Sequence, residues 1–111
     1  MALPDESFSP EAKPAAAAAL RVVRGPQTGV SIQLGDAPQT IGRSPQRDVF
    51  LNDMTVSRQH ATITRTERGR LITDEHSFNG VWVNNENVDA HLLQAGDIIQ
   101  IGAFCLLYQE E

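Results

Sequence analysis

Three side chains that could bind an anion lie within four residues of one another: the hydroxyl of Ser57, the guanidinium of Arg58 and the imidazole of His60. They belong to the segment 55–61, which follows turn-forming residues and leads into an alternating run at 61–65. This pattern is typical of a loop that enters a β-strand. The sequence therefore predicts that these three groups lie on a loop at one end of a strand.

A second arginine, Arg43, follows Gly42 at the end of another short run. Arginine offers a planar fork that fits a phosphate or a carboxylate, and a phosphate monoester carries nearly two negative charges and three acceptor oxygens. Gly42 allows the backbone before Arg43 to approach a neighbouring segment closely. We expect Arg43, Ser57 and Arg58 to form the side-chain part of an anion site. The alternatives are a structural ion pair for Arg43 and a solvated surface position for Arg58.

A third segment, 77–84, supplies groups that suit an extended peptide. The side chain of Asn79 has both a donor and an acceptor, which match the main chain of a peptide. Gly80 suits a tight turn. We interpret the three segments as loops that converge at one end of a β-sandwich and bind a phosphorylated peptide.

Ser57 and His60 could also belong to a small hydrolase, with Asp48 or Asp74 as the third member of a triad. However, the sequence contains no G-x-S-x-G nucleophile elbow. Residues three positions apart on an extended segment also project to opposite faces. We therefore predict a binding module and not an enzyme. Turnover of an activated ester that is abolished by Ser57→Ala would support the hydrolase instead.

The candidate metal ligands His60, His76, His91 and Cys105 are scattered, without the spacing of a metal site. The sequence has no Walker or dinucleotide-binding glycine pattern either. We predict no metal and no cofactor. The single cysteine cannot form an internal disulfide, and its apolar neighbours predict a buried thiol.

Length and charge restrict the class of protein. The chain has 111 residues, which predicts one domain. Its formal net charge of −5 argues against nucleic acid as the partner, because binding to a phosphate backbone needs a broad basic surface. No apolar run approaches the length that crosses a bilayer, and the first residues do not resemble a secretory signal. We expect a cytoplasmic protein that does not insert into membranes.

Short apolar runs separated by turn residues recur about every 8–12 positions from residue 20 onward, which predicts an all-β sandwich or barrel. Asn84-Asn85 reads as a tight hairpin turn, because asparagine tolerates a positive φ. Residues 1–19 are rich in proline, alanine and acidic residues, so we predict a flexible tail followed by a domain at 20–111. The strands are expected at 20–24, 30–34, 39–41, 49–51, 61–66, 71–73, 81–83, 86–88, 98–101 and 104–108.

Four motifs follow one another in an order and spacing that resemble the forkhead-associated (FHA) domain: Gly42-Arg43, 56–61, 77–84 and 93–102. The resemblance covers roughly residues 20–108. It implies a β-sandwich of about eleven strands with functional loops at one end. It also implies a module that binds phosphothreonine peptides in Ser/Thr kinase signalling, without catalysis.

The resemblance assigns Arg43 to the phosphate and the peptide, Ser57 to the phosphate, and Asn79 to the peptide main chain. Arg58 occupies a position that often adds a basic contact. Further binding residues and residues that support the loops complete the predicted site: Ser77 and Phe78, then Gly42, His60 and Gly80.

Three residues before Asn79 depart from the family's pattern. Phe78 stands where the family often has threonine, so an apolar ring replaces a hydroxyl near the phosphate. His76 stands where the family often has glycine, and histidine can adopt the left-handed conformation that such a turn needs. Glu75 is unfavourable beside a dianion unless it points away. These departures either lower the affinity for phosphate or, at Phe78, offer the peptide an apolar surface.

An acidic tail followed by one FHA domain is similar to the layout of small actinobacterial regulators. In those, a kinase phosphorylates a tail threonine, and the domain then binds its own tail and releases metabolic enzymes. The tail here contains Ser7 and Ser9 but no threonine, and serine lacks the γ-methyl group, so we expect self-capture to be weak or absent.

The expected partners of the domain, as a monomer, are a phosphothreonine-containing protein and a Ser/Thr protein kinase. The alternative is a phospho-independent regulator that holds a metabolic enzyme or a scaffold partner through the same loops.

Overall fold

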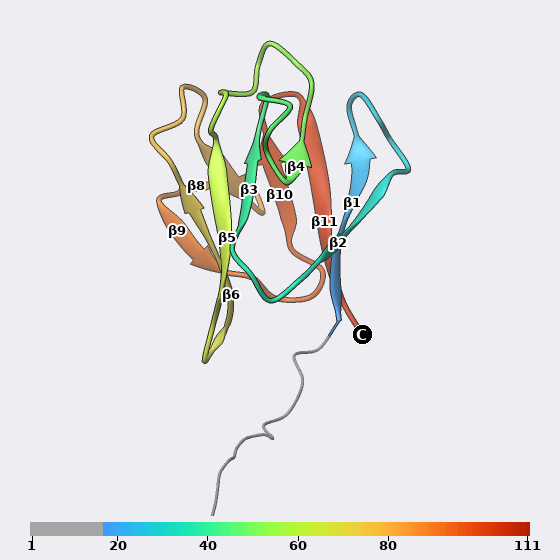
Figure 1. Ribbon diagram of the computed structural model, residues 1–111, viewed down its shortest axis with the longest axis vertical. Coiled ribbons are helices and arrows are strands. Elements are labelled where there is room, and N and C mark those ends of the chain that lie inside the picture. The colour runs from blue at the N-terminus through green and yellow to red at the C-terminus, as the bar shows by residue number, and fades with distance from the viewer. Residues whose placement is uncertain (1–16) are drawn as a thin grey trace, which may run out of the picture.

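Two β-sheets packed face to face make up the computed structural model, which describes residues 17–111 (Figure 1). One sheet has six strands in the order β2-β1-β11-β10-β7-β8, and the other has five in the order β4-β3-β5-β6-β9. These eleven strands confirm the predicted all-β sandwich. No helix in the described part of the chain could span a membrane. The strands are β1 (Ala18–Arg24), β2 (Ser31–Leu34), β3 (Gln39–Gly42), β4 (Val49–Phe50), β5 (Ala61–Thr66), β6 (Gly69–Asp74), β7 (Val81–Val83), β8 (Glu86–Val88), β9 (Ala90–Leu92), β10 (Ile98–Ile101) and β11 (Phe104–Glu110).

Alternation along the strands produces the core between the sheets. In β11, Phe104, Leu106 and Tyr108 are buried, whereas Cys105 and Leu107 face outward and are partly exposed. Cys105 therefore corrects the expectation of a buried thiol, because its apolar neighbours in sequence occupy the other face of the strand. Each fully buried aliphatic or aromatic side chain contributes about 1.5–3 kcal/mol to folding.

The first strand starts at Ala18, two residues earlier than the strand expected at 20–24. Ala18 pairs with Leu34 on one side and with Glu110 on the other, and its side chain is buried. A methyl group at this position continues the inward face of β1, so the first residues of the strand share the composition of the predicted tail. Residues 1–16 of that tail lie outside the described residues.

Two further differences concern edge strands. The sequence did not predict β9, which pairs with β6 and has only three residues, one of them polar. The two-residue strand β4 pairs with β3 in parallel, unlike every other recorded pair. The Asn84-Asn85 hairpin is confirmed, since φ is 51° and 71° at these residues.

Antiparallel pairing brings the candidate loops to one end of the sandwich. Ile41 pairs with Ala61, and Ala61 pairs with Asp74, so β3 ends where β5 begins and β6 ends. In the other sheet, Val81 pairs with Ile101, which places the start of β7 beside the turn between β10 and β11. These loops lie at the top of Figure 1, and β1 begins at the opposite end.

Candidate functional site

Gly42 and Arg43, at the end of β3, contact the loop between β4 and β5. A Cβ atom at Gly42 would collide with the carbonyl oxygen of Arg58, so only glycine permits this approach. Arg43 is held against the same loop twice: its N–H donates to Ser57 O at 2.9 Å, and its Nε–H donates to Val56 O at 3.0 Å. The half-buried stem of Arg43 is therefore fixed beside the backbone of Ser57.

His60 connects the loop 51–60 to the loop 75–80. Its side chain is fully buried. Nδ1 accepts a hydrogen bond from the N–H of Ser57 at 3.0 Å, which leaves Nε2 as the donor to Gly80 O at 2.8 Å. The imidazole therefore bridges the two loops, and the supporting role of His60 stays a prediction.

Ser57 and Phe78 are joined directly. The Oγ of Ser57 accepts a hydrogen bond from the N–H of Phe78 at 3.0 Å. A hydroxyl that accepts in this way can still donate its hydrogen to a ligand. The next residue, Arg58, has an exposed side chain. The structure thus brings the backbone of Arg43 next to Ser57, and Arg58 follows Ser57 directly in the chain.

Asn79, the residue after Phe78, joins the same two loops through its side chain. Its Nδ2–H donates to Thr55 O at 2.7 Å, and its main-chain carbonyl accepts the indole N–H of Trp82 at 3.0 Å. The side chain is exposed. Its amide keeps a second N–H and an oxygen with which it could meet a peptide main chain.

Ser77 closes the turn that presents Phe78 and Asn79. Its Oγ accepts the N–H of Gly80 at 2.9 Å, and its own N–H donates to Asp74 Oδ1 at 3.1 Å. Gly80 has a φ of +83°, and a Cβ there would lie 2.7 Å from Nδ2 of Asn87. The hydroxyl of Ser77 thus takes part in the turn itself.

The two polar departures from the family's pattern fit this geometry. His76 has a φ of 59°, which confirms that histidine can supply the left-handed residue of this turn. The carboxylate of Glu75 accepts a hydrogen bond from the hydroxyl of Thr62 at 2.9 Å, on the neighbouring strand β5.

Three carboxylates on or beside the candidate loops each accept a hydrogen bond from a threonine hydroxyl. These pairs are Asp48 with Thr40, Asp53 with Thr55 and Glu75 with Thr62. The N–H and the hydroxyl of Thr40 lower the pKa of Asp48, and the hydroxyl and the N–H of Thr55 lower the pKa of Asp53. Both carboxylates are therefore ionised at neutral pH and already engaged.

No ion pair within residues 17–111 involves the arginines of the site. The ion pairs recorded within residues 17–111, Arg65 with Asp36 and His91 with Asp97, lie on other segments. Arg43 and Arg58 thus have no carboxylate partner in the described part of the chain. Within residues 17–111 this result argues against a structural ion pair as the reason for Arg43, whose Nε–H donates to the carbonyl oxygen of Val56 instead.

Thr55 is a loop residue that the sequence reasoning missed. Its Oγ1 accepts the N–H of Ala103 at 2.8 Å, and a Cβ at Gly102 would collide with the same atom. The Asp53-x-Thr55 spacing is a recognisable local turn signal. The contact with the turn between β10 and β11 has no such signal, because it spans 48 positions in the sequence.

A triad is not assembled at Ser57. The Nδ1 of His60 receives the backbone N–H of Ser57 and not its hydroxyl, and Nε2 faces Gly80 O. A general base must lie within hydrogen-bond reach of the hydroxyl that it activates. Asp74, one candidate third member, accepts the N–H of Ser77. The geometry therefore suits binding and not hydrolysis. Residues 17–111 also hold no group of three potential metal ligands.

A pocket of about 260 Å³ opens next to Asn79. Thr55, Asn79 and Trp82 line it together with the turn between β10 and β11. Of the predicted binding residues, Asn79 lines this pocket. A peptide chain held at Asn79 could extend into it.

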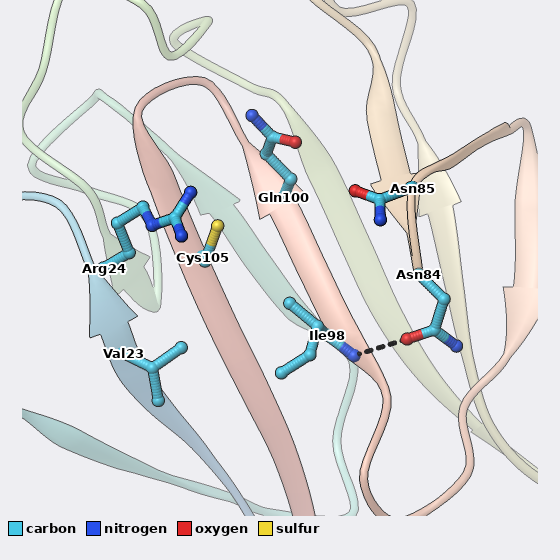
Figure 2. Close-up of a pocket in the computed structure, with 7 residues that line it drawn as sticks. All are labelled: Val23, Arg24, Asn84, Asn85, Ile98, Gln100 and Cys105. Atoms are coloured by element: carbon cyan, nitrogen blue, oxygen red, sulfur yellow. Dashed lines mark hydrogen bonds between the residues drawn. The ribbon is translucent and has the colours of Figure 1, made fainter.

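A second pocket, of about 450 Å³, lies on the outer face of the six-stranded sheet (Figure 2). Arg24 and Cys105 stand next to each other on one side, and the amides of Gln100 and Asn85 lie on the other. A hydrogen bond joins two of the lining residues: the N–H of Ile98 donates to Asn84 Oδ1 at 3.0 Å. None of the predicted binding residues lines this pocket.

Comparison with known proteins places these features in a family. The family model described as FHA domain matches residues 39–102. The chain is 43% identical over 102 residues to the oxoglutarate dehydrogenase inhibitor of Corynebacterium glutamicum, which covers 92% of this chain and 71% of that protein. It is 43% identical over 99 residues to the glycogen accumulation regulator GarA of Mycolicibacterium smegmatis, covering 88% and 62%.

Solved structures also match the fold of this chain. One from a study of phosphothreonine-dependent FHA domain interactions has a TM-score of 0.78 and 29% identity, and the match covers 86% of this chain and 97% of that chain. Mycobacterium tuberculosis EmbR in complex with a low-affinity phosphopeptide also has a TM-score of 0.78, with 35% identity, covering 85% of this chain and 24% of that one.

Proposed function

Since the chain belongs to the FHA domain family, we propose that it binds phosphothreonine peptides and acts in Ser/Thr kinase signalling by recruiting or regulating partner proteins. The observation that carries this proposal is that Arg43 and Arg58, on the segments that meet at Ser57, have no carboxylate partner within residues 17–111. Arg43 and Ser57 are hydrogen-bonded through their backbones at 2.9 Å, and Arg58 follows immediately. A phosphate dianion supplies the missing negative charge and the acceptor oxygens.

Each predicted residue has a role in this proposal. Arg43 contacts phosphate and peptide, Ser57 donates its hydroxyl to the phosphate, and Arg58 adds a second basic contact. Asn79 binds the main chain of the peptide next to the phosphothreonine. Further residues line or support the site: Ser77 and Phe78 line it, and Gly42, His60 and Gly80 support its loops.

Selectivity for threonine over serine would come from the γ-methyl group. One buried carbon in a fitted apolar pocket changes affinity by about 10–200-fold. A module that releases its targets is expected to bind near micromolar affinity, about −8 kcal/mol.

The names of the relatives support regulation of partner proteins, since two of them are an inhibitor and a regulator. The proposed partners are a phosphothreonine-containing protein and the Ser/Thr kinase that modifies it. We propose that the domain acts as a cytoplasmic monomer.

The experiment is a titration with a degenerate phosphothreonine peptide library, alongside phosphoserine and unphosphorylated libraries. The emission of Trp82, the single tryptophan, provides a readout because its indole is hydrogen-bonded to Asn79. We expect binding to the phosphothreonine library and loss of that binding in Ser57→Ala. Equal binding to the unphosphorylated library would contradict the proposal.

A phospho-independent regulator is the second candidate. It is favoured by Phe78, whose ring is 92% exposed on the same loops. An unphosphorylated enzyme or scaffold partner that binds equally well to wild type and to Ser57→Ala would support this candidate over the first.

A further inference from the structure

The two most exposed large apolar side chains of the described residues lie on the loops of the candidate site. Phe78 is 92% exposed and Met54 is 86% exposed, whereas the other large apolar side chains on the surface, from Val30 down, are 44% exposed or less. Single exposed apolar residues are ordinary. Here two residues 24 positions apart in sequence are brought to neighbouring loops next to one anion site.

The backbones that carry these side chains are fixed. Met54 occupies a turn in which the N–H of Val56 donates to Asp53 O at 3.0 Å. Phe78 donates its N–H to Ser57 Oγ, and the next residue, Asn79, bonds Thr55 O at 2.7 Å. These bonds join the two loops immediately beside Met54 and Phe78. A side chain on a fixed backbone loses less conformational entropy when it binds, which favours affinity.

We propose that Met54 and Phe78 form an apolar rim that selects a large aliphatic or aromatic residue beside the phosphothreonine of the ligand. This inference rests on the proposed function, because the occupant of the rim is the same peptide that is held at Arg43 and Ser57. The rim is continuous with that site: the N–H of Phe78 bonds the hydroxyl assigned to the phosphate. Where the family often has a threonine hydroxyl, Phe78 offers an apolar ring, and the ligand supplies the matching apolar side chain.

The test is a leucine scan of a phosphothreonine peptide whose six flanking residues are otherwise alanine. For wild type, leucine at one position or more is expected to tighten binding about tenfold over the alanine peptide, as for one buried apolar group. Phe78→Thr and Met54→Thr should each bring the leucine-to-alanine affinity ratio toward one. Val30→Thr is the matched control, because it removes an apolar side chain that is 44% exposed from another loop.

The outcomes separate the two proposals. If wild type binds the alanine peptide in a phosphate-dependent way but shows no leucine preference, the rim is rejected and the proposed function stands. The rim is also rejected if the leucine preference survives in both loop variants. If no phosphorylated peptide binds wild type, both proposals fail.

Sedimentation of the same proteins tests whether a second copy of the chain, and not the peptide, occupies the rim. If wild type self-associates with rising concentration and Phe78→Thr abolishes that association, the rim is an interface with a second copy. That result would overturn the assignment to the peptide. A monomer at every concentration, with the leucine preference present, is the expected result.

Discussion

Polar clusters lie at the two ends of β7, and they differ in how their hydrogen bonds are arranged. At the far end, the side chain of Asp97 is 11% exposed and accepts three hydrogen bonds. The donors are Gln94 N–H at 2.8 Å, Asn84 Nδ2 at 3.0 Å and His91 Nε2 at 3.1 Å. At the loop end, Arg43 and Arg58 face no carboxylate within residues 17–111, and the carboxylates of these loops bond threonines.

One cluster therefore satisfies its own donors and acceptor, whereas the other contains cations that lack an anion within residues 17–111. A buried carboxylate surrounded by its own donors has little capacity left for another molecule. A set of donors without an internal anion has capacity for an external one. Each cluster contains polar and charged side chains, so the presence of such residues alone does not show which cluster has donors to spare.

Arg43→Ala should show the largest effect, a loss of about 2–5 kcal/mol in phosphothreonine peptide binding, as for removal of one partner of a buried charge pair. Arg43→Lys keeps the charge but loses the planar fork, so its affinity for the peptide is expected to lie between those of wild type and Arg43→Ala. Titration calorimetry measures the affinities. Arg65→Ala is the control, because its guanidinium bonds the exposed Asp36. Wild-type affinity in Arg43→Ala would show that the loop end is not the binding region.

Gly42→Ala should reduce the free energy of unfolding by about 1–3 kcal/mol, the usual effect of forcing atoms into a packed position. The added Cβ would collide with the carbonyl of Arg58, so the two loops must separate. Chemical denaturation gives the value. Gly35→Ala is the matched control, since a Cβ there meets no atom within 4 Å. Equal stability of the two variants would mean that this close approach is not needed.

His60→Phe should destabilise the fold by about 1–3 kcal/mol, because it leaves the N–H of Ser57 and Gly80 O without their buried partner. Peptide binding should weaken as well, since the loops lose their common support. Thermal unfolding and peptide titration report the two effects. His76→Asn, an exposed change that keeps a positive φ accessible, is expected to stay within about 0.5 kcal/mol.

Asp97→Asn should give the smallest effect, a flatter dependence of stability on pH. Burial raises the pKa of Asp97, but hydrogen bonds from Gln94, Asn84 and His91 outweigh it, so the net pKa lies below its ordinary value. The carboxylate therefore stabilises the fold above the unfolded-state pKa, near 3.8. That stability is lost as the pH falls through the lower folded-state pKa.

Denaturant unfolding at a series of pH values from neutral to acid measures this contribution. Wild type is expected to lose more stability over the acid range than Asp97→Asn does. Parallel curves for the two proteins would show that the Asp97 cluster does not hold the fold through its charge.

Much of the fold could be predicted from the sequence because its signals are local. Alternation at 61–66 and 98–101 predicts strands with one face buried, since side chains alternate between the faces of a sheet. Asn84-Asn85 predicts its hairpin because few residues accept a positive φ. Local signals failed at β9 and at the start of β1, where short or alanine-rich segments depend on neighbouring strands.

The site divides in the same way. The types and order of Arg43, Ser57, Arg58 and Asn79 indicate an anion site, because these groups have the donors that phosphate and a peptide main chain require. Tertiary structure decided which donors remain for a ligand. The threonine partner of Glu75 on β5 and the link from Thr55 to Ala103 join residues 13 and 48 positions apart. Sheet pairing creates such contacts, so they become visible only once the strands are in register.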